Sequence, residues 1–246
     1  MFPDVIILAV AFSLGAFVGI IIWPFVTSDQ KQSTQPVEAA SQSRRSFADR
    51  FKGTAEIQEA LKIIGQIAIN HAGVENSLNY LLWQLRAYEY STRNKQAKRP
   101  LNDVQYDLRQ MRREAKKQLI VQKLKEVRDL LSKGRIEKRL DELGKKAEML
   151  ARWQELESRT DTLSNERNEV IHSGVSWSEN RLMRKTGSVL DQEPLPINLA
   201  LDNALAQNLG KLMIEFGVFT TGLGNILPFK SDDQIITNVA KIELKE

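Results

Sequence analysis

A long run without charged side chains lies near the N-terminus. Residues 5–26, VIILAVAFSLGAFVGIIIWPFV, would form a helix of about 33 Å, close to the hydrocarbon thickness of a bilayer. A cleaved signal peptide is the competing interpretation, but no Lys or Arg precedes the run and no small-residue cleavage site follows it. The pattern therefore predicts a single transmembrane anchor over residues 1–27.

The charges on either side of this run predict its orientation. Asp4 precedes the run, whereas Lys31, Arg44 and Arg45 follow it. The positive-inside rule then places the C-terminal bulk of the chain in the cytoplasm, as part of a single-pass protein of the inner or plasma membrane. A G-x-x-x-G pair at positions 15 and 19 is either a helix dimer face or a pair of ordinary lipid-facing glycines.

The polar pattern changes after the anchor. Residues 28–53 are rich in Ser, Gln and Thr and have no clear period, which predicts a flexible tether. Over residues 54–230 apolar side chains recur every three or four positions, which predicts an all-α domain. Residues 231–246 are interpreted as a C-terminal tail. The stripe of the first helix consists of Ile57, Leu61, Ile64, Ala68, Leu78, Leu82 and Leu85.

The same spacing predicts further helices. One runs from Val104 to Leu131, and another covers residues 136–150 and runs on, or turns, into a segment ending at Gly174. Residues 174–196 are short-period, turn-rich and closed by two prolines, which predicts a hairpin or an irregular insert. A last helix is expected from Asn198 to Leu223.

Composition removes several kinds of chemistry. The chain has no cysteine and two histidines, so disulfides, thiolate metal sites and cysteine nucleophiles are excluded and a dedicated transition-metal centre is not expected. The chain also lacks a phosphate-binding G-x-x-x-x-G-K-[ST] loop, an H-E-x-x-H pair and a serine nucleophile elbow. We therefore predict neither a cofactor nor a metal.

Three polar residues fall on apolar helix stripes. His71 and Glu75 lie in the middle of the first stripe, and Arg167 lies on the stripe of the later helix. A buried charge is costly unless it is paired, so Glu75 and Arg167 are predicted to lie close together, with His71 nearby. Such a cluster is either a structural ion pair that fixes helix register or part of a functional site.

The stretch SNERNEVIHSG contains the second histidine. Arg167 and His172 would lie about 140° apart on an ideal helix, whereas Asn168 and His172 share a face. Ser173 and Gly174 are typical of a helix end, where the backbone can depart from ideal geometry and the helix dipole favours a protonated imidazole. The alternative is that His172 is only a polar C-terminal residue of a helix.

The run Arg167-Asn168-x3-His172 resembles the R-x4-6-H motif of the HEPN superfamily, here in a membrane-anchored chain. The resemblance covers an all-helical domain in which the motif ends a late helix, over residues 54–227. It implies a HEPN-like helical bundle and a metal-independent endoribonuclease that brings two motifs together in a homodimer. It further implies that His172 acts as acid or base, Arg167 binds or orients phosphate and Asn168 assists. Glu75 and His71, selected by their place on the apolar stripe, are predicted to support this site.

The basic residues are concentrated in one part of the chain. Residues 93–146 contain eighteen Lys and Arg against eight Asp and Glu, a net charge of +10 in a chain whose formal total is +4. This segment is a solvated helix face, a surface for RNA or a surface for anionic lipid headgroups.

Three interpretations remain open. The first is a membrane-tethered HEPN endoribonuclease acting on RNA as a toxin or defence factor, controlled by an antitoxin partner that the sequence does not identify. The second is a non-catalytic, membrane-anchored helical scaffold or sensor. The third is a helical, membrane-associated structural protein in which the motif is accidental. A dimer with paired His172 side chains in a basic cleft would favour the first.

Overall fold

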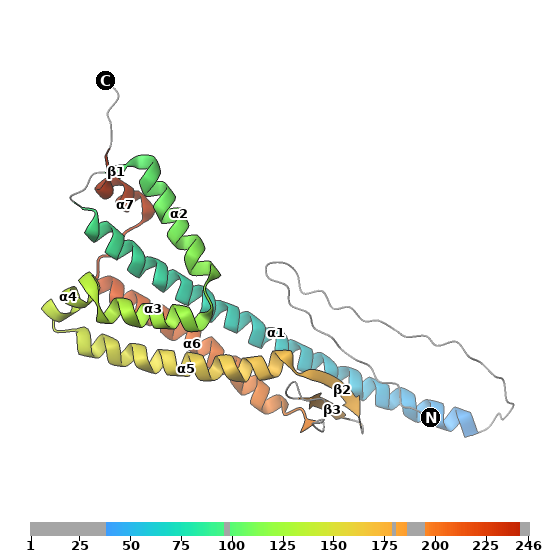
Figure 1. Ribbon diagram of the computed structural model, residues 1–246. Helices are drawn as coiled ribbons and strands as arrows, with labels where there is room; N and C mark the ends of the chain where they lie inside the picture. The colour runs from blue at the N-terminus through green and yellow to red at the C-terminus, as the bar shows by residue number, and fades with distance from the viewer. Residues whose placement is uncertain (1–37, 96–98, 179–180, 186–194, 242–246) are drawn as a thin grey trace. The chain divides into compact units, whose positions relative to one another are not determined.

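The computed structural model describes residues 38–95, 99–178, 181–185 and 195–241 (Figure 1). Most of these residues are helical, as predicted, in seven helices. The helices are α1 (Glu38–Arg93), α2 (Leu101–Lys117), α3 (Ile120–Ser132), α4 (Gly134–Glu142), α5 (Lys146–His172), α6 (Leu199–Ile226) and α7 (Asp232–Val239). The strands are β1 (Arg99–Pro100), β2 (Gly174–Ser178), β3 (Arg181–Lys185), β4 (Leu195–Pro196) and β5 (Ala240–Lys241).

The chain divides into two compact units. The first holds the residues up to Ala68 together with Asn165–Ala206, and the second holds Ile69–Ser164 and the residues from Gln207 onward. Helices α1, α5 and α6 each contribute residues to both units. The units are described separately below.

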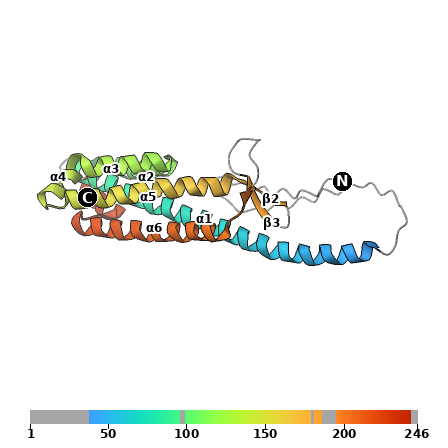
Figure 2. The ribbon, with the colours of Figure 1, turned by 90° about the horizontal axis from the view of Figure 1, so that it is seen from below.

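Aromatic side chains form the centre of the second unit. Trp153 of α5 is fully buried and packs against two rings of α6, with centroid distances of 6.1 Å to Phe216 and 5.7 Å to Phe219. In this unit α5 and α6 lie side by side (Figure 2). Burial of three large rings in edge-on and tilted contacts is a major source of stability for a helical unit.

Ion pairs connect α1 to the helices that cover it. The Arg86 guanidinium donates to both carboxylate oxygens of Glu126 on α3, each at 2.6 Å, and to the Met111 carbonyl of α2 at 3.0 Å. Glu89 accepts hydrogen bonds from the backbone N–H groups of Arg135 and Ile136, at 2.9 and 3.0 Å. Because the first turn of a helix leaves its N–H groups without intrahelical partners, Glu89 caps α4 from α1.

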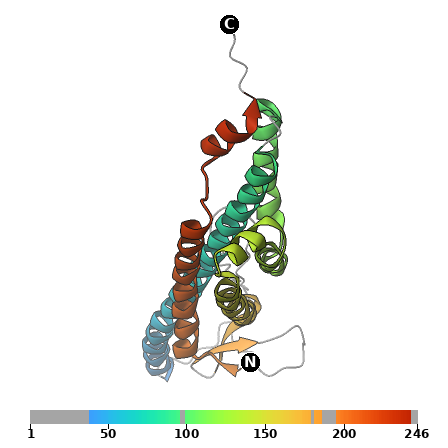
Figure 3. The same cartoon turned by 90° about the vertical axis from the view of Figure 1, so that its left-hand side faces the viewer.

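A smaller apolar cluster holds α7 against α2 (Figure 3). The Arg112 guanidinium lies 4.4 Å from the centre of the Trp83 ring and donates to Asp232 at 2.7 Å. The buried members of the cluster are Trp83, Ala87, Val104, Leu108, Ile235, Val239 and Ala240. Strand β1, which precedes α2, pairs in parallel with β5, which follows α7, so strand pairing adds to the contact between these two helices.

The first turn of α7 gives a testable stability effect. The Ser231 hydroxyl accepts from the Gln234 N–H at 3.3 Å, and the Gln234 side chain accepts from the Ser231 N–H at 2.9 Å, which is a capping box. Ser231→Ala should lower the free energy of unfolding by about 1 kcal/mol, measured by urea titration. Thr237→Ala is the control, because that hydroxyl only bonds the Asp233 carbonyl of its own helix; an equal loss in both variants would contradict the capping role.

The first unit contains the predicted hairpin. Strands β2 and β3 pair antiparallel from Gly174 opposite Lys185 to Ser178 opposite Arg181, and β4 adds a short third strand beside β3. Strand β2 begins at Gly174, shortly after α5 ends at His172, so the helix that carries the motif leads directly into the hairpin.

Helix boundaries differ from the prediction at three places. The single helix expected over Val104–Leu131 is broken at residues 118 and 119, whose backbone is extended, and the Gln122 side chain accepts from the Leu119 N–H at 3.0 Å to start α3. The stretch over residues 136–150 is broken at Gly144, whose φ of +63° suits glycine. The tail from residue 231 contains α7 because its apolar residues complete the α2 cluster.

The expected tether also differs from the structure. Helix α1 begins at Glu38, so residues 38–53 of the tether predicted over 28–53 are helical. Their Ala, Glu, Gln, Arg and Lys residues are good helix formers that extend the amphipathic helix beyond its apolar stripe. The predicted anchor at residues 5–26 lies outside the described residues, and none of the described helices is long and apolar enough to cross a bilayer.

Candidate functional site

The predicted motif lies in the last two turns of α5, within the first unit. Arg167 Nη1 donates to Asn168 Oδ1 at 2.8 Å. Arg167 is partly buried, whereas Asn168 is exposed. The structure thus brings together the first two residues of the motif.

His172 is the last residue of α5 and is exposed. Val170 and Ile171 beside it are buried, and the Ser173 hydroxyl donates to the Val170 carbonyl at 2.9 Å, which helps to end the helix. The imidazole therefore lies at the exposed C-terminal end of the helix.

An ion pair fixes the hairpin that follows the motif. Arg184 of β3 forms a bidentate pair with Asp202 of α6, through Nη1 to Oδ1 at 2.9 Å and through Nη2 to Oδ2. Asp202 is only 5% exposed, and it lies in the first turn of α6, where a carboxylate is stabilised by the helix dipole. Sequence reasoning missed this pair, because the two residues are joined through a turn-rich segment without a regular period.

The other two predicted site residues, His71 and Glu75, lie on α1 in the second unit. His71 Nε2 lies 3.4 Å from the Ser164 hydroxyl of α5. Glu75 accepts a 2.6 Å hydrogen bond from Lys123 Nζ of α3, and the Lys123 side chain is fully buried while that of Glu75 is 41% exposed. The predicted proximity of Glu75 to Arg167 joins residues of different units and stays a prediction.

Sequence reasoning missed Lys123 as the partner of Glu75. Lys123 lies one helical turn before Val127 on the apolar stripe of α3, together with the buried Leu131. A lysine on an apolar stripe is the same signal that selected Glu75, and it would have identified the pair.

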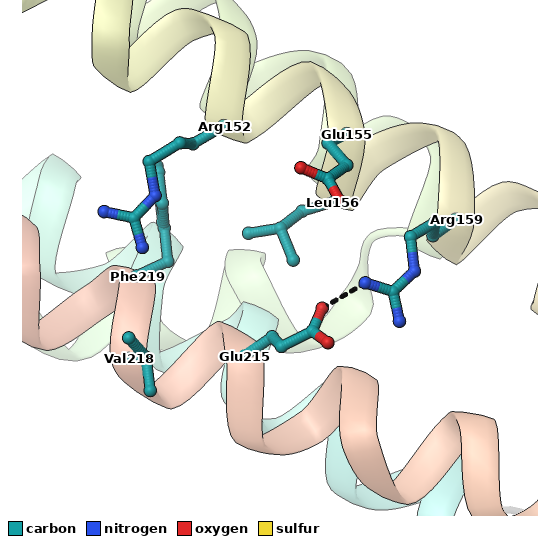
Figure 4. Close-up of a pocket in the computed structure, with 7 residues that line it drawn as sticks. All are labelled: Arg152, Glu155, Leu156, Arg159, Glu215, Val218 and Phe219. Carbon is teal, nitrogen blue, oxygen red and sulfur yellow. Dashed lines mark hydrogen bonds and ion pairs between the residues drawn. The ribbon is translucent and has the colours of Figure 1, made fainter.

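Two of the pockets within the second unit have ion-paired residues in their lining. One, of about 220 Å³, lies between α5 and α6 (Figure 4). Arg159 pairs with Glu215 across it, while Leu156 and Phe219 supply apolar walls. A ligand that used Arg159 or Glu215 would have to displace the ion pair between them.

The other pocket, of about 450 Å³, lies beside α1 and is lined in part by Arg86, Glu89 and Arg99. Arg99 pairs with Asp107, and the Tyr90 hydroxyl donates to the same carboxylate at 3.0 Å. Burial and this hydrogen bond raise the pKa of Tyr90 to about 12, so its hydroxyl stays protonated at neutral pH. Because Arg86 and Arg99 are already ion-paired with Glu126 and Asp107, we assign no ligand class to this pocket.

No group of three or more His, Asp or Glu side chains that could hold a metal ion occurs among the residues that the structure describes. The candidate chemistry consists of the arginine, amide and imidazole at the end of α5.

Comparison with known proteins adds no assignment: no protein-family model, no curated protein and no solved structure matches the chain.

Proposed function

We propose that the chain is a membrane-tethered, metal-independent endoribonuclease of the HEPN type that acts as a dimer, in the role of a toxin or defence factor. The observation that carries the proposal is the arrangement at the end of α5. There Arg167 and Asn168 share a 2.8 Å hydrogen bond, and His172 is exposed at the helix terminus one turn beyond Asn168.

These groups suit cleavage of RNA by its own ribose. A base removes the proton of a 2′-OH, the 2′-oxygen bonds to phosphorus, and the 5′-oxygen leaves with a proton from an acid. The products are a 2′,3′-cyclic phosphate and a 5′-hydroxyl. Imidazole titrates near neutral pH and can serve as either base or acid, and guanidinium binds phosphate oxygens in a bidentate manner. His172 takes the first role and Arg167 the second, with Asn168 holding the guanidinium.

Each chain supplies one motif histidine, whereas the reaction uses both a base and an acid. Two copies that bring their α5 ends together provide both. A shared membrane anchor would favour this dimer, because confinement to a bilayer raises the effective concentration of one copy near another. The uncharged run at residues 5–26 supplies that anchor in the proposal.

The proposal is tested by incubating the full chain with a mixed RNA substrate in the presence of EDTA. Fragments with 2′,3′-cyclic phosphate and 5′-hydroxyl ends are expected at a rate that rises with the fraction of dimer, which crosslinking measures in parallel. A folded, dimeric chain that leaves the RNA intact would remove the ribonuclease proposal.

A second candidate is a non-catalytic, membrane-anchored helical scaffold or sensor. The observation in its favour is that several charged residues of the second unit form ion pairs between helices or their flanking segments, namely Arg86–Glu126, Arg99–Asp107 and Arg159–Glu215. Such pairing stabilises helix contacts, which suits a scaffold. Intact RNA in the cleavage experiment would favour this candidate.

A further inference from the structure

The corner between α2 and α3 exposes two aliphatic side chains. The backbone is extended at Gln118 and Leu119, so the chain leaves the helical path there. Leu119 is 70% exposed and Val121 is 60% exposed. Nothing in the core of the second unit requires these residues to be apolar, since they face away from it. We call residues 116–125, KKQLIVQKLK, the lysine corner.

Lysine residues flank the two aliphatic residues along the sequence. Lys116, Lys117 and Lys125 are exposed, and the corner contains no Asp or Glu. Lys116 and Lys117 form no ion pair with any of the described residues, while Lys125 lies near Asp129. The fourth lysine, Lys123, is buried and paired with Glu75, so it contributes structure rather than surface charge. Three cations therefore flank an exposed Leu and Val.

This combination fits one kind of partner. Lysines attract anionic headgroups, and aliphatic side chains gain free energy by entering the acyl boundary below them. A surface for single-stranded RNA would instead be expected to offer aromatic rings on which bases stack, and the lysine corner has none. An exposed Leu and Val beside lysines can gain free energy by entering the boundary of a lipid surface.

We propose that the lysine corner docks onto an anionic lipid surface, with Leu119 and Val121 entering the headgroup boundary and Lys116, Lys117 and Lys125 binding lipid phosphates or carboxylates. This inference does not rest on ribonuclease activity. If residues 5–26 anchor the chain, the corner is a second contact with the same bilayer, which would limit the orientations that the second unit can adopt.

The absence of cysteine from the chain makes a site-specific test possible. Val121→Cys is labelled with an environment-sensitive fluorophore, and the full chain is reconstituted into nanodiscs of phosphatidylcholine with or without phosphatidylserine. Val218→Cys on α6 is the matched control, since it replaces the same residue type at 55% exposure outside the lysine corner. Nitroxide-labelled lipids report whether the fluorophore enters the bilayer.

The expected result is a blue shift and nitroxide quenching at position 121 in phosphatidylserine nanodiscs, with little change at position 218. In the Val121→Cys background, replacing Lys116, Lys117 and Lys125 by Gln should weaken docking by about fivefold per charge, or on the order of a hundredfold together. The same signal should fall as salt shortens the screening length.

Three outcomes would overturn the inference. The first is no lipid response at position 121, and the second is an equal response at position 218. The third is a response at position 121 to added RNA in nanodiscs of phosphatidylcholine alone without any response to phosphatidylserine, which would make the corner a nucleic-acid surface. Each readout is independent of RNA cleavage, so it is unaffected by whether the chain proves to be a ribonuclease.

Discussion

Replacing His172 by alanine should reduce RNA cleavage by the full chain by about 10³–10⁴-fold, because loss of a positioned general acid or base costs up to that range. The variant removes the histidine from both copies of a dimer, so the base and the acid disappear together. Initial rates of formation of 2′,3′-cyclic phosphate ends measure the loss. The fold should be unaffected, since the side chain is exposed and substitutions at such positions change stability by about 0.5 kcal/mol or less.

The second histidine of the chain provides a matched control. His71→Gln keeps a group that can hydrogen-bond Ser164, which lies 3.4 Å from the imidazole in the second unit. This variant should lose much less activity than His172→Ala, because the proposal makes His172 the acid or base whereas His71 is predicted only to support the site. Equal cleavage by wild type and His172→Ala would show that the activity comes from elsewhere, and equal loss in both histidine variants would show that the effect is structural.

Substitution of Arg167 tests whether its guanidinium acts in catalysis or only in RNA binding. Arg167→Lys keeps the charge but loses the planar fork that can hold Asn168 and a phosphate at once. Under the proposed mechanism it should lower the cleavage rate more than it weakens RNA binding, as followed by fluorescence anisotropy. A loss of binding without a loss of maximal rate would make Arg167 part of a general RNA surface.

The sequence could predict those elements whose positions are determined by residues close together in the chain. The stripe around Leu78, Leu82 and Leu85 identified α1, and the turn-rich composition after Gly174 identified the hairpin. The break at Gln118 had no such signal: neither Gly nor Pro occurs there, and the capping contact to Leu119 comes from an ordinary glutamine. Helix α7 was missed because its apolar face is completed only by α2 and Trp83, far away in the sequence.

The candidate site likewise has features that neighbouring residues determine and features that depend on tertiary packing. Arg167, Asn168 and His172 lie on one helix, so their relative positions can be predicted from their spacing in the sequence. The residue at which α5 ends can likewise be predicted from its neighbours in the sequence. The choice of partner for Glu75 depends instead on which helix packs against α1. Arg167 and Lys123 both lie on apolar stripes, and periodicity alone does not rank them; the 2.6 Å bond to Lys123 is a tertiary result.

Glu75→Ala should lower the free energy of unfolding by about 3 kcal/mol, because it leaves the buried ammonium of Lys123 without its carboxylate. Lys123→Met alone should cost less, about 1 kcal/mol. The thioether fills a similar volume in that variant, and Glu75 is exposed enough to be hydrated. Urea unfolding of the full chain in detergent, followed by tryptophan fluorescence, measures both values.

The double variant tests whether charge burial is the cause. Glu75→Ala combined with Lys123→Met should unfold within about 1 kcal/mol of wild type, since no buried charge remains. Asp129→Ala serves as the exposed control, because its Lys133 partner has a side chain 74% exposed and such pairs contribute about 1 kcal/mol or less. If the double variant is as unstable as Glu75→Ala, the carboxylate acts through packing rather than charge.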